Sequence, residues 1–183
     1  MAMRIVGLSG SLRAASSNAA LIRAAFARLP PEVERLLYEG IGSLPHFNPD
    51  IDKEGDVPAP AVAELRALLR RADGFIISVP EYAHGLPGAF KNALDWLVSS
   101  GELAKKPILV LNASAGGQYS QANLVETLTL IEGEVLEASL LAPFVRTRLT
   151  ADGALGEAES TALAVAVTAL LAAIVAAARI DRS

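Results

Sequence analysis

The sequence predicts an α/β fold: a doubly wound parallel sheet of five strands with helices on both faces. Short apolar runs alternate with helix-like segments about five times along the chain, and such β-α repeats connect through right-handed crossovers. The interior runs are apolar without alternation, Phe75-Ile76-Ile77 being the clearest, as in parallel strands that are covered on both faces. The segments between them are rich in Ala and Leu, which favours helices.

The expected elements follow one another in a regular order. Strands are expected at residues 3–8, 33–38, 74–79, 107–112 and 144–147. Helices are expected at residues 19–29, 58–72, 87–99, 118–131 and 157–179. Residues 40–60 break this rhythm because they hold four prolines and several acidic side chains. We interpret them as a long surface loop that either covers the site or contacts another subunit.

The last helix could be mistaken for a membrane span. Residues 161–178 carry no charge, but half of them are Ala, which contributes little to membrane insertion. We therefore expect a helix packed on the sheet by one side, with a neighbouring helix or subunit against the other. Trp96 and Leu97 stand at exposed-looking ends of the apolar third and fourth helices, which is consistent with a subunit contact there.

Composition narrows the functional classes. A chain of 183 residues, 52% hydrophobic and 20% charged, is expected to form one globular domain over residues 1–183. The net charge of -4 and the lack of a basic cluster argue against nucleic acid as a partner. The N-terminal apolar run is too short for a secretory signal, which predicts a cytoplasmic protein that is not attached to a membrane.

Cysteine and histidine usage restricts the chemistry further. The chain has no Cys, which excludes disulfides, thiol nucleophiles and Cys-ligated metals. His46 and His84 are far apart and lack a metal-ligand pattern, so no metal site is expected. Any redox chemistry must therefore come from a cofactor.

A hydroxyl-rich loop separates the first strand from the first helix. It reads Ser9-Gly10-Ser11-Leu12-Arg13-Ala14-Ala15-Ser16-Ser17-Asn18. Main-chain N–H groups, hydroxyls, an Arg and an Asn at the positive end of a helix dipole suit a phosphate. The loop matches neither G-x-G-x-x-G nor G-x-x-x-x-G-K-[ST], which disfavours a dinucleotide pyrophosphate and a triphosphate with magnesium. The sequence therefore predicts a single terminal phosphate, bound by Ser11, Arg13, Ser16 and Asn18.

Two further loops are expected at the same edge of the sheet, because the carboxyl ends of parallel strands lie together. Residues 80–88, after the third strand, offer a rigid turn, an aromatic face and backbone amides. Residues 113–119, after the fourth strand, form a small-residue loop that can approach a flat ring closely. A planar heteroaromatic ring attached to a phosphate fits both loops.

Three segments together resemble the NADPH-dependent FMN reductase family of flavodoxin-like proteins, which includes quinone, chromate and azo-dye reductases. They are Gly10-Ser11-Leu12-Arg13-x-x-Ser16-x-Asn18, then Pro80-Glu81-Tyr82 continuing into Leu86-Pro87-Gly88-x-x-Lys91-Asn92-Ala93-Leu94-Asp95-Trp96, and more loosely residues 114–117. The resemblance covers most of the chain in order and spacing. It implies a flavodoxin-like fold, FMN as the cofactor and NADPH or NADH as the electron donor.

The resemblance also implies a role for each loop. Ser11, Arg13, Ser16 and Asn18 would hold the FMN phosphate. The isoalloxazine ring would be lined by Pro80, Glu81, Tyr82 and Ala83, with Ser114, Gly116 and Gly117 on its other edge. This chain has Ala83-His84 where many members have Asn or Gly after Pro-Glu-Tyr.

We therefore expect an oxidoreductase whose flavin carries the chemistry, without a catalytic nucleophile or an obligate base among the side chains. Reduced nicotinamide gives hydride to FMN N5 and leaves. A quinone, azo compound, metal oxyanion or free flavin then takes the electrons in a ping-pong cycle. The family resemblance also implies a homodimer or homotetramer that acts on a small-molecule electron acceptor.

Two alternatives remain open at this point. One is a flavodoxin-type electron carrier, which binds FMN but reacts with protein partners instead of nicotinamide. The other is a partner-binding module that keeps the fold without an enzymatic activity, since a fold does not determine function. Oxidation of NAD(P)H separates the reductase from the carrier, and binding of flavin separates both from the module.

Overall fold

The protein is described by a computed structural model covering residues 2–53, 55–113, 117–141 and 155–180. Its centre is a parallel sheet in the order β2-β1-β3-β4, with β5 and β6 both paired to β4. The strands are β1 (Arg4–Ser9), β2 (Glu34–Tyr38), β3 (Gly74–Ser78), β4 (Pro107–Asn112), β5 (Glu134–Val135) and β6 (Leu140–Leu141). This order is that of the flavodoxin-like doubly wound fold, so the predicted fold class is confirmed.

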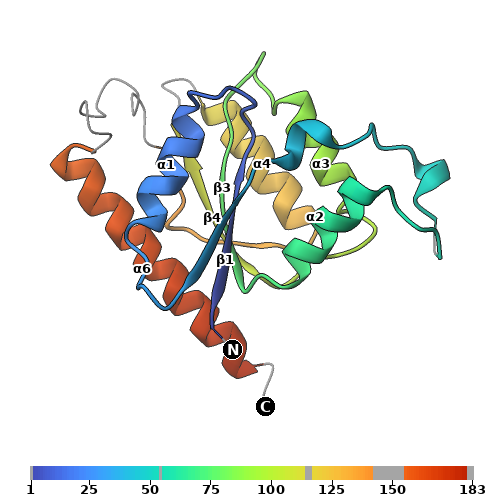
Figure 1. The fold of residues 1–183 in the computed structure, drawn as a ribbon. Helices are drawn as coiled ribbons and strands as arrows, with labels where there is room; N and C mark the ends of the chain where they lie inside the picture. The colour runs from blue at the N-terminus through green and yellow to red at the C-terminus, as the bar shows by residue number, and fades with distance from the viewer. Residues whose placement is uncertain (1, 54, 114–116, 142–154, 181–183) are drawn as a thin grey trace.

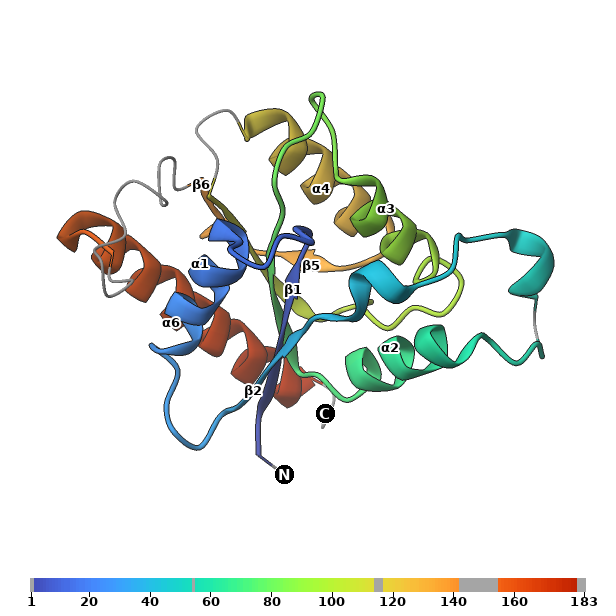
Figure 2. The same cartoon turned by 45° about the horizontal axis from the view of Figure 1, so that its top comes forward.

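Helices cover both faces of the sheet (Figures 1 and 2). They are α1 (Ser17–Phe26), α2 (Pro60–Arg70), α3 (Gly88–Asp95), α4 (Gln118–Leu130) and α6 (Glu157–Ile180), with short 3-10 helices η1 (Gly40–Ser43) and η2 (Pro49–Ile51). On β3, Phe75 and Ile77 belong to the core under α2, α3 and α4, whereas Ile76 belongs to the core under α1 and α6. Both faces of this strand are buried, which explains its unbroken apolar sequence.

The fifth position of the sheet differs from its predicted form. Two strands of two residues occupy it, and between them residues 136–139 lie beside only residues 109–110 of β4. The hydroxyl of Ser139 accepts the N–H of Val110 at 3.1 Å, so a side chain replaces the backbone partner within this bulge. The strand expected at residues 144–147 lies outside the described residues.

The end of α3 corrects an expectation. The helix ends at Asp95 and is followed by turns, and Trp96 and Leu97 are buried, with 0% and 2% of their surface exposed. The indole N–H of Trp96 donates to the carbonyl of Pro45 at 2.8 Å, and its ring packs edge-on against Phe47 at 5.1 Å. These two residues are therefore core residues under the 40–60 loop, not an exposed subunit contact.

The acidic part of that loop is fixed to α2. Asp52 forms an ion pair with Arg66 at 2.8 Å and accepts the hydroxyl of Ser99 at 2.6 Å. The hydrogen bond from Arg66 is the main cause that lowers the pKa of Asp52 below its ordinary value. The loop extends from the side of the molecule that carries α2 (Figure 1).

The closing helix α6 packs on the sheet by one side only. Leu163, Leu170 and Ile174 are buried there, and a Cβ on Gly74 would lie 2.6 Å from Ile174, so the helix approaches β3 closely. Its outer side is exposed, with 64% of Val165 accessible. Within the described part of the chain, α6 is the one helix long and apolar enough to cross a membrane by length and composition, and 28% of its most apolar window is buried.

Candidate functional site

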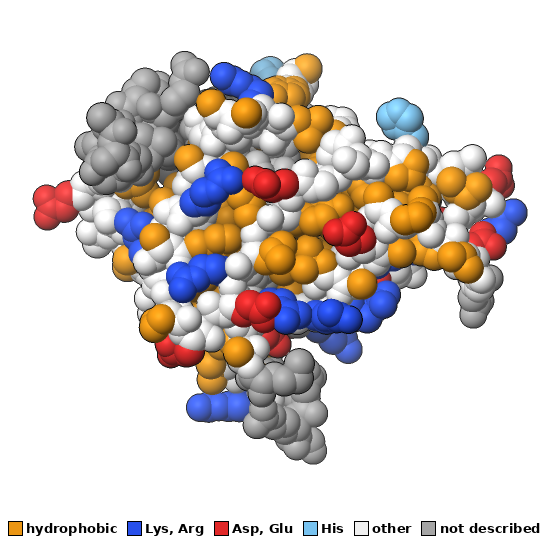
Figure 3. Space-filling view, in the orientation of Figure 1, with side chains coloured by type: hydrophobic (Ala, Val, Ile, Leu, Met, Phe, Trp, Pro, Cys, Tyr) orange, Lys and Arg blue, Asp and Glu red, His pale blue; other side chains and the backbone are white. Residues whose placement is uncertain are grey.

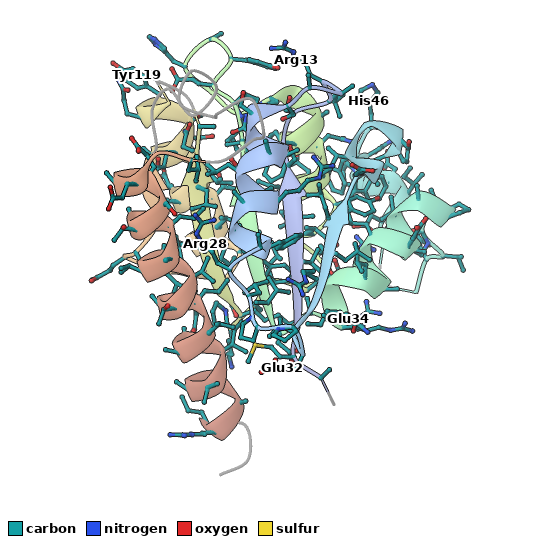
Figure 4. All side chains as sticks on the ribbon, turned by 60° about the vertical axis from the view of Figure 1, so that its left-hand side comes forward. Arg13, Arg28, Glu32, Glu34, His46 and Tyr119 are labelled. Carbon is teal, nitrogen blue, oxygen red and sulfur yellow. The ribbon has the colours of Figure 1, made fainter. Side chains whose placement is uncertain are left out.

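The candidate site lies where the chain changes direction in the sheet. β1 pairs with β2 on one side and with β3 on the other, so the loops after β1 and β3 leave the same edge at a topological switch point. Arg13, from the loop after β1, and Tyr119, from the first turn of α4, lie at the same end of the molecule (Figure 4). This brings the predicted loops to one edge, as expected.

The loop after β1 is fixed to β3 at its start. The N–H of Gly10 donates to the carbonyl of Ser78 at 2.9 Å, and a Cβ on Gly10 would lie 2.7 Å from Val79. The loop then folds on its own hydroxyls, since Ser9 accepts the N–H of Ser11 and Ser11 accepts the N–H of Arg13, both at 3.4 Å. At position 10 only glycine allows the loop to approach β3 this closely, because a Cβ there would collide with the Val79 side chain.

The start of α1 presents unused hydrogen-bond donors. Ser16 is the N-cap, and its hydroxyl accepts the N–H of Ala19 at 3.2 Å. Among the residues that the structure describes, the N–H groups of Ser17 and Asn18 have no acceptor. Free amides at a helix N-terminus together with the helix dipole favour an anion. The donors of this turn therefore fit a phosphate.

Asn18 connects the helix to β3. Its Oδ1 accepts the hydroxyl of Ser78 at 2.8 Å, and both side chains are buried. Because Oδ1 is engaged, the amide NH2 is the end of Asn18 that remains to donate to a ligand. Ser78 is a residue that the sequence analysis missed, although a Ser that ends a fully apolar strand was a signal for it.

Arg13 extends from the loop into solvent (Figure 4). It forms no ion pair with any of the described residues. A pocket of about 330 Å³ opens beside it and is also lined by Ser9 and Ser11. Ser16 and Asn18 do not line this pocket, so only two of the four predicted phosphate ligands, Ser11 and Arg13, share it.

The loop after β3 makes a two-residue turn. The N–H and carbonyl groups of Tyr82 and Gly85 bond to each other at 3.1 and 3.0 Å. Between them Ala83 and His84 both have positive φ, 50° and 60°, a region that L-residues other than Gly and Asn occupy at a cost of about 1–2 kcal/mol each. The residues that differ from the family pattern are therefore the residues under backbone strain.

This loop is bonded to the start of α4. Oε2 of Glu81 accepts the N–H groups of Tyr119 and Ser120 at 3.0 and 2.9 Å. The rings of His84 and Tyr119 stack with centroids 4.2 Å apart. The side chain of Glu81 thus caps α4 and positions the loop after β3 relative to the start of this helix. The hydrogen bonds of Tyr119 and Ser120 could not be predicted from the sequence, because their partner, Glu81, is distant along the chain.

Gly117 has a clear steric role. A Cβ at this position would lie 2.2 Å from Nδ2 of Asn112, whose amide donates to the carbonyl of Gly117 at 2.8 Å. Only glycine leaves room for this buried amide. The other two residues predicted for this edge, Ser114 and Gly116, lie outside the described residues. Pro80 is half-buried, and Tyr82 is exposed beside this edge.

The polar side chains of α3, which follows the loop after β3, bond to other residues of the fold. Asn92 donates to Pro45 and accepts the N–H of Phe47, at 2.9 and 2.7 Å. Lys91 and Asp95 form an ion pair one turn apart on α3. Asn92 therefore holds α3 to the 40–60 loop, whereas the Lys91–Asp95 pair lies within α3. Within the described ranges, no group of three or more His, Asp or Glu side chains could hold a metal ion.

Comparison with known proteins identifies the family. Residues 3–145 match the family model of NADPH-dependent FMN reductase. The chain is 34% identical over 139 residues to a quinone reductase of Escherichia coli, covering 73% of each chain. It is 34% identical over 135 residues to an NAD(P)H-dependent FMN reductase of Pseudomonas aeruginosa, covering 71% of each chain.

A solved structure has the same fold over almost the whole chain. The flavoenzyme NAD(P)H:(acceptor) oxidoreductase FerB of Paracoccus denitrificans superimposes with a TM-score of 0.79 at 27% identity, covering 94% of this chain and 97% of that one. Its likeness extends the match from the family model to the closing helix. The chain therefore belongs to the NADPH-dependent FMN reductase family and is an oxidoreductase that uses FMN with NAD(P)H.

Proposed function

We propose that this protein reduces a small-molecule acceptor with electrons from NAD(P)H through FMN, in a ping-pong cycle. The observation that carries the proposal is the free pair of amides at the start of α1, beside Arg13 and one strand away from the ring loops. When bound, FMN supplies the redox chemistry, taking hydride at N5 and passing electrons on. The acceptor classes are quinones, azo compounds, metal oxyanions and free flavin.

The phosphate subsite follows from the donors at the start of α1. In our proposal the N–H groups of Ser17 and Asn18 and the amide NH2 of Asn18 donate to the phosphate, with Arg13 above it. Ser11 and Ser16 have hydroxyls whose oxygens already accept local N–H groups, so their O–H protons remain to donate outward. A dianion at this position gains charge-assisted hydrogen bonds without a metal.

The ring subsite is the space between the loops after β3 and β4. We assign Pro80, Tyr82 and Ala83 to one side of the ring, with Glu81 as the residue that sets the distance to α4. Ser114, Gly116 and Gly117 are assigned to the other edge. No side chain here is assigned as a nucleophile or an obligate base, and backbone N–H groups near the ring stabilise negative charge that develops on it.

Steady-state kinetics with two varied substrates test the ping-pong cycle. We expect parallel double-reciprocal lines when NADH is varied at several fixed quinone concentrations, because the first product leaves before the quinone binds. Intersecting lines would overturn the ping-pong order. The alternative, a flavodoxin-type carrier, predicts no oxidation of NADH until a protein partner is added.

The quaternary structure and location are also proposals. We propose a cytoplasmic single-domain protein, residues 1–183, that forms a homodimer or homotetramer. Exposed apolar residues support an assembly: Val98 after α3 and Leu130 at the end of α4 are 61% and 82% exposed beside one surface groove. Light scattering on the native protein and on Leu130→Glu tests this. A monomer in both would contradict it.

A further inference from the structure

The pocket beside Arg13 is larger than one phosphate needs. Its volume of about 330 Å³ is in the range of small-molecule sites, about 300–1,000 Å³. The loop after β1 forms one wall. The other wall is formed by residues of α1 and of the chain around the end of β2: Arg23, Leu37, Tyr38, Glu39, Ile41 and Gly42. The FMN site proposed above uses none of this second wall.

The second wall and Leu12 enclose an apolar slot. Tyr38 and Ile41 are buried at 8% and 3% exposure, and burial raises the pKa of the Tyr38 phenol, which keeps it neutral. Leu12 is 62% exposed and faces this slot from the other side. A Cβ on Gly42 would lie 3.2 Å from Leu12, so a larger residue there would narrow the slot. Such walls accept a flat, uncharged ring.

One ion pair stands at the pocket. Nη2 of Arg23 binds Oε1 of Glu39 at 3.0 Å, while Oε2 of Glu39 has no hydrogen-bond partner among the described residues. The pair is neutral overall, and it presents one carboxylate oxygen beside an apolar slot. On the face that carries α1 and β2, acidic and basic side chains lie next to one another, with hydrophobic side chains around them (Figure 3). Beside Glu39 the pocket therefore suits a neutral hydroxyl donor more than an anion.

The position of Glu39 adds a topological argument. It directly follows β2, the strand beside the phosphate-binding loop of β1. In dinucleotide-binding βαβ units an acidic residue after the second strand accepts hydrogen bonds from the hydroxyls of the adenosine ribose, and it disfavours a 2′-phosphate there. Here β1, α1, β2 and a following acidic residue stand in that order. The loop after β1 lacks the glycine fingerprint, and the start of α1 is assigned to the flavin phosphate, so only the ribose contact is carried over.

We propose that this pocket binds the adenosine part of the nicotinamide coenzyme, with Glu39 accepting the ribose hydroxyls, and that it selects NADH over NADPH. The proposal rests on the reductase function given above. The adenine fills the slot between Leu12 and Ile41. A 2′-phosphate would meet the Glu39 carboxylate, while Arg13 is used by the flavin phosphate and Arg23 by Glu39. Like charges about 4 Å apart near a protein surface cost enough for at least a tenfold loss of affinity.

Calorimetric titration of the FMN-loaded protein with NAD⁺ and NADP⁺ tests this without turnover. We expect NAD⁺ to bind at least about tenfold more tightly than NADP⁺. In Glu39→Gln the ratio falls toward one, and in Glu39→Arg it reverses. Glu126→Gln, which removes an exposed carboxylate on α4, is the matched control and keeps the wild-type ratio. Glu39 is exposed, so its variants are expected to fold, and the flavin spectrum confirms their loading.

Three results would overturn the inference: no detectable NAD⁺ binding, tighter binding of NADP⁺ by the native protein, or an unchanged ratio in both Glu39 variants. The proposed reductase function fails in a different way. If neither NADH nor NADPH reduces the bound flavin of the native protein, the reductase is contradicted whatever the calorimetric ratio is. If both reduce it and the ratio is unaffected by Glu39, only the pocket assignment is wrong.

Discussion

Glu81 caps the first turn of α4: its carboxylate accepts the N–H of Tyr119 at 3.0 Å across 38 positions of sequence. The contact joins the loop after β3 to the start of α4. The Glu81 carboxylate therefore sets the position of the loop after β3 relative to α4. In our proposal Glu81 is a positioning residue of the ring site.

Replacing Glu81 by Gln should weaken both the helix cap and the flavin site. A carboxylate at a helix N-terminus stabilises by about 0.3–1 kcal/mol, so we expect a small fall in thermal stability and a several-fold weaker FMN affinity. Thermal unfolding and flavin fluorescence titration measure the two effects. Glu126→Gln, further along α4, serves as the control and should change neither. Unchanged FMN affinity in Glu81→Gln would contradict the proposed dependence of the ring site on this helix cap.

Replacing Arg13 by Ala tests the phosphate contact. A hydrogen bond to a charged group contributes about 1.5–3 kcal/mol, so the Kd for FMN should rise by about 10- to 150-fold. Riboflavin, which lacks the phosphate, should bind Arg13→Ala and the native protein equally. Arg71→Ala, an exposed cation at the opposite end of the sheet, is the control. Equal losses for FMN and riboflavin would show that Arg13 does not contact the phosphate.

Gly117→Ala should destabilise the fold. The added Cβ would lie 2.2 Å from Nδ2 of Asn112, so the buried amide must move, and we expect a loss of about 1–3 kcal/mol. Chemical denaturation measures it. Gly88→Ala is the matched control, because nothing lies within 4 Å of its Cβ; it should be neutral or slightly stabilising at the start of α3. In an Asn112→Ala background, Gly117→Ala should cost less stability, because the side chain that it collides with is shortened. If the stability losses of the two single variants simply add in the double variant, the collision between position 117 and Asn112 is contradicted.

The Asp52–Arg66 ion pair predicts a pH dependence. The pKa of Asp52 is lowered from its ordinary value of 3.8, so the pair contributes stability that is present above pH 3.8 and is lost as the pH falls through the lower, folded-state pKa. Asp52→Asn should be less stable near neutral pH and lose less on acidification. Asp50→Asn, at an exposed carboxyl, is the control. Parallel stability curves for Asp52→Asn and the native protein would contradict the pair.

Ala83→Gly should stabilise the loop after β3. Ala83 has φ of 50°, and glycine removes the conformational cost of about 1–2 kcal/mol that Ala has in this region. About 0.5–1 kcal/mol of this gain is lost, because glycine gives the unfolded chain more conformational entropy. A rise in the free energy of unfolding of up to about 1.5 kcal/mol is therefore expected. Ala14→Gly, in a loop position without positive φ, should not stabilise. Destabilisation by Ala83→Gly would show that the turn is not strained.

Much of the fold could be predicted from the sequence because the three central strands, β1, β3 and β4, are buried on both faces. The run Phe75-Ile76-Ile77 falls on β3, and residues 107–112 coincide with β4. Two-residue strands could not be predicted in this way: Glu134-Val135 and Leu140-Leu141 are too short for a periodic pattern, and the bulge between them shifts the register. Trp96 was misjudged because its partner, Pro45, is distant in sequence.

The candidate site was predictable where a single loop defines it. Ser16 was assigned to the phosphate in a hydroxyl-rich loop and is the N-cap of α1. The contacts of Glu81 and the Asn18–Ser78 bond were not predictable, because each joins segments that only the fold brings together. The left-handed conformation of Ala83 and His84 was not predictable either, since neither residue type favours it. The Arg23–Glu39 ion pair was not predictable either, because it also joins residues that only the fold brings together.

In our proposal this chain carries FMN and receives electrons on it directly from a nicotinamide coenzyme. The most direct measurement is the visible absorbance spectrum of the FMN-loaded protein, recorded without oxygen before and after NADH is added. We expect the flavin bands to bleach with NADH and to return when a quinone is added. Flavin bands that persist with NADH and NADPH alike, or a protein that takes up no FMN, would contradict it.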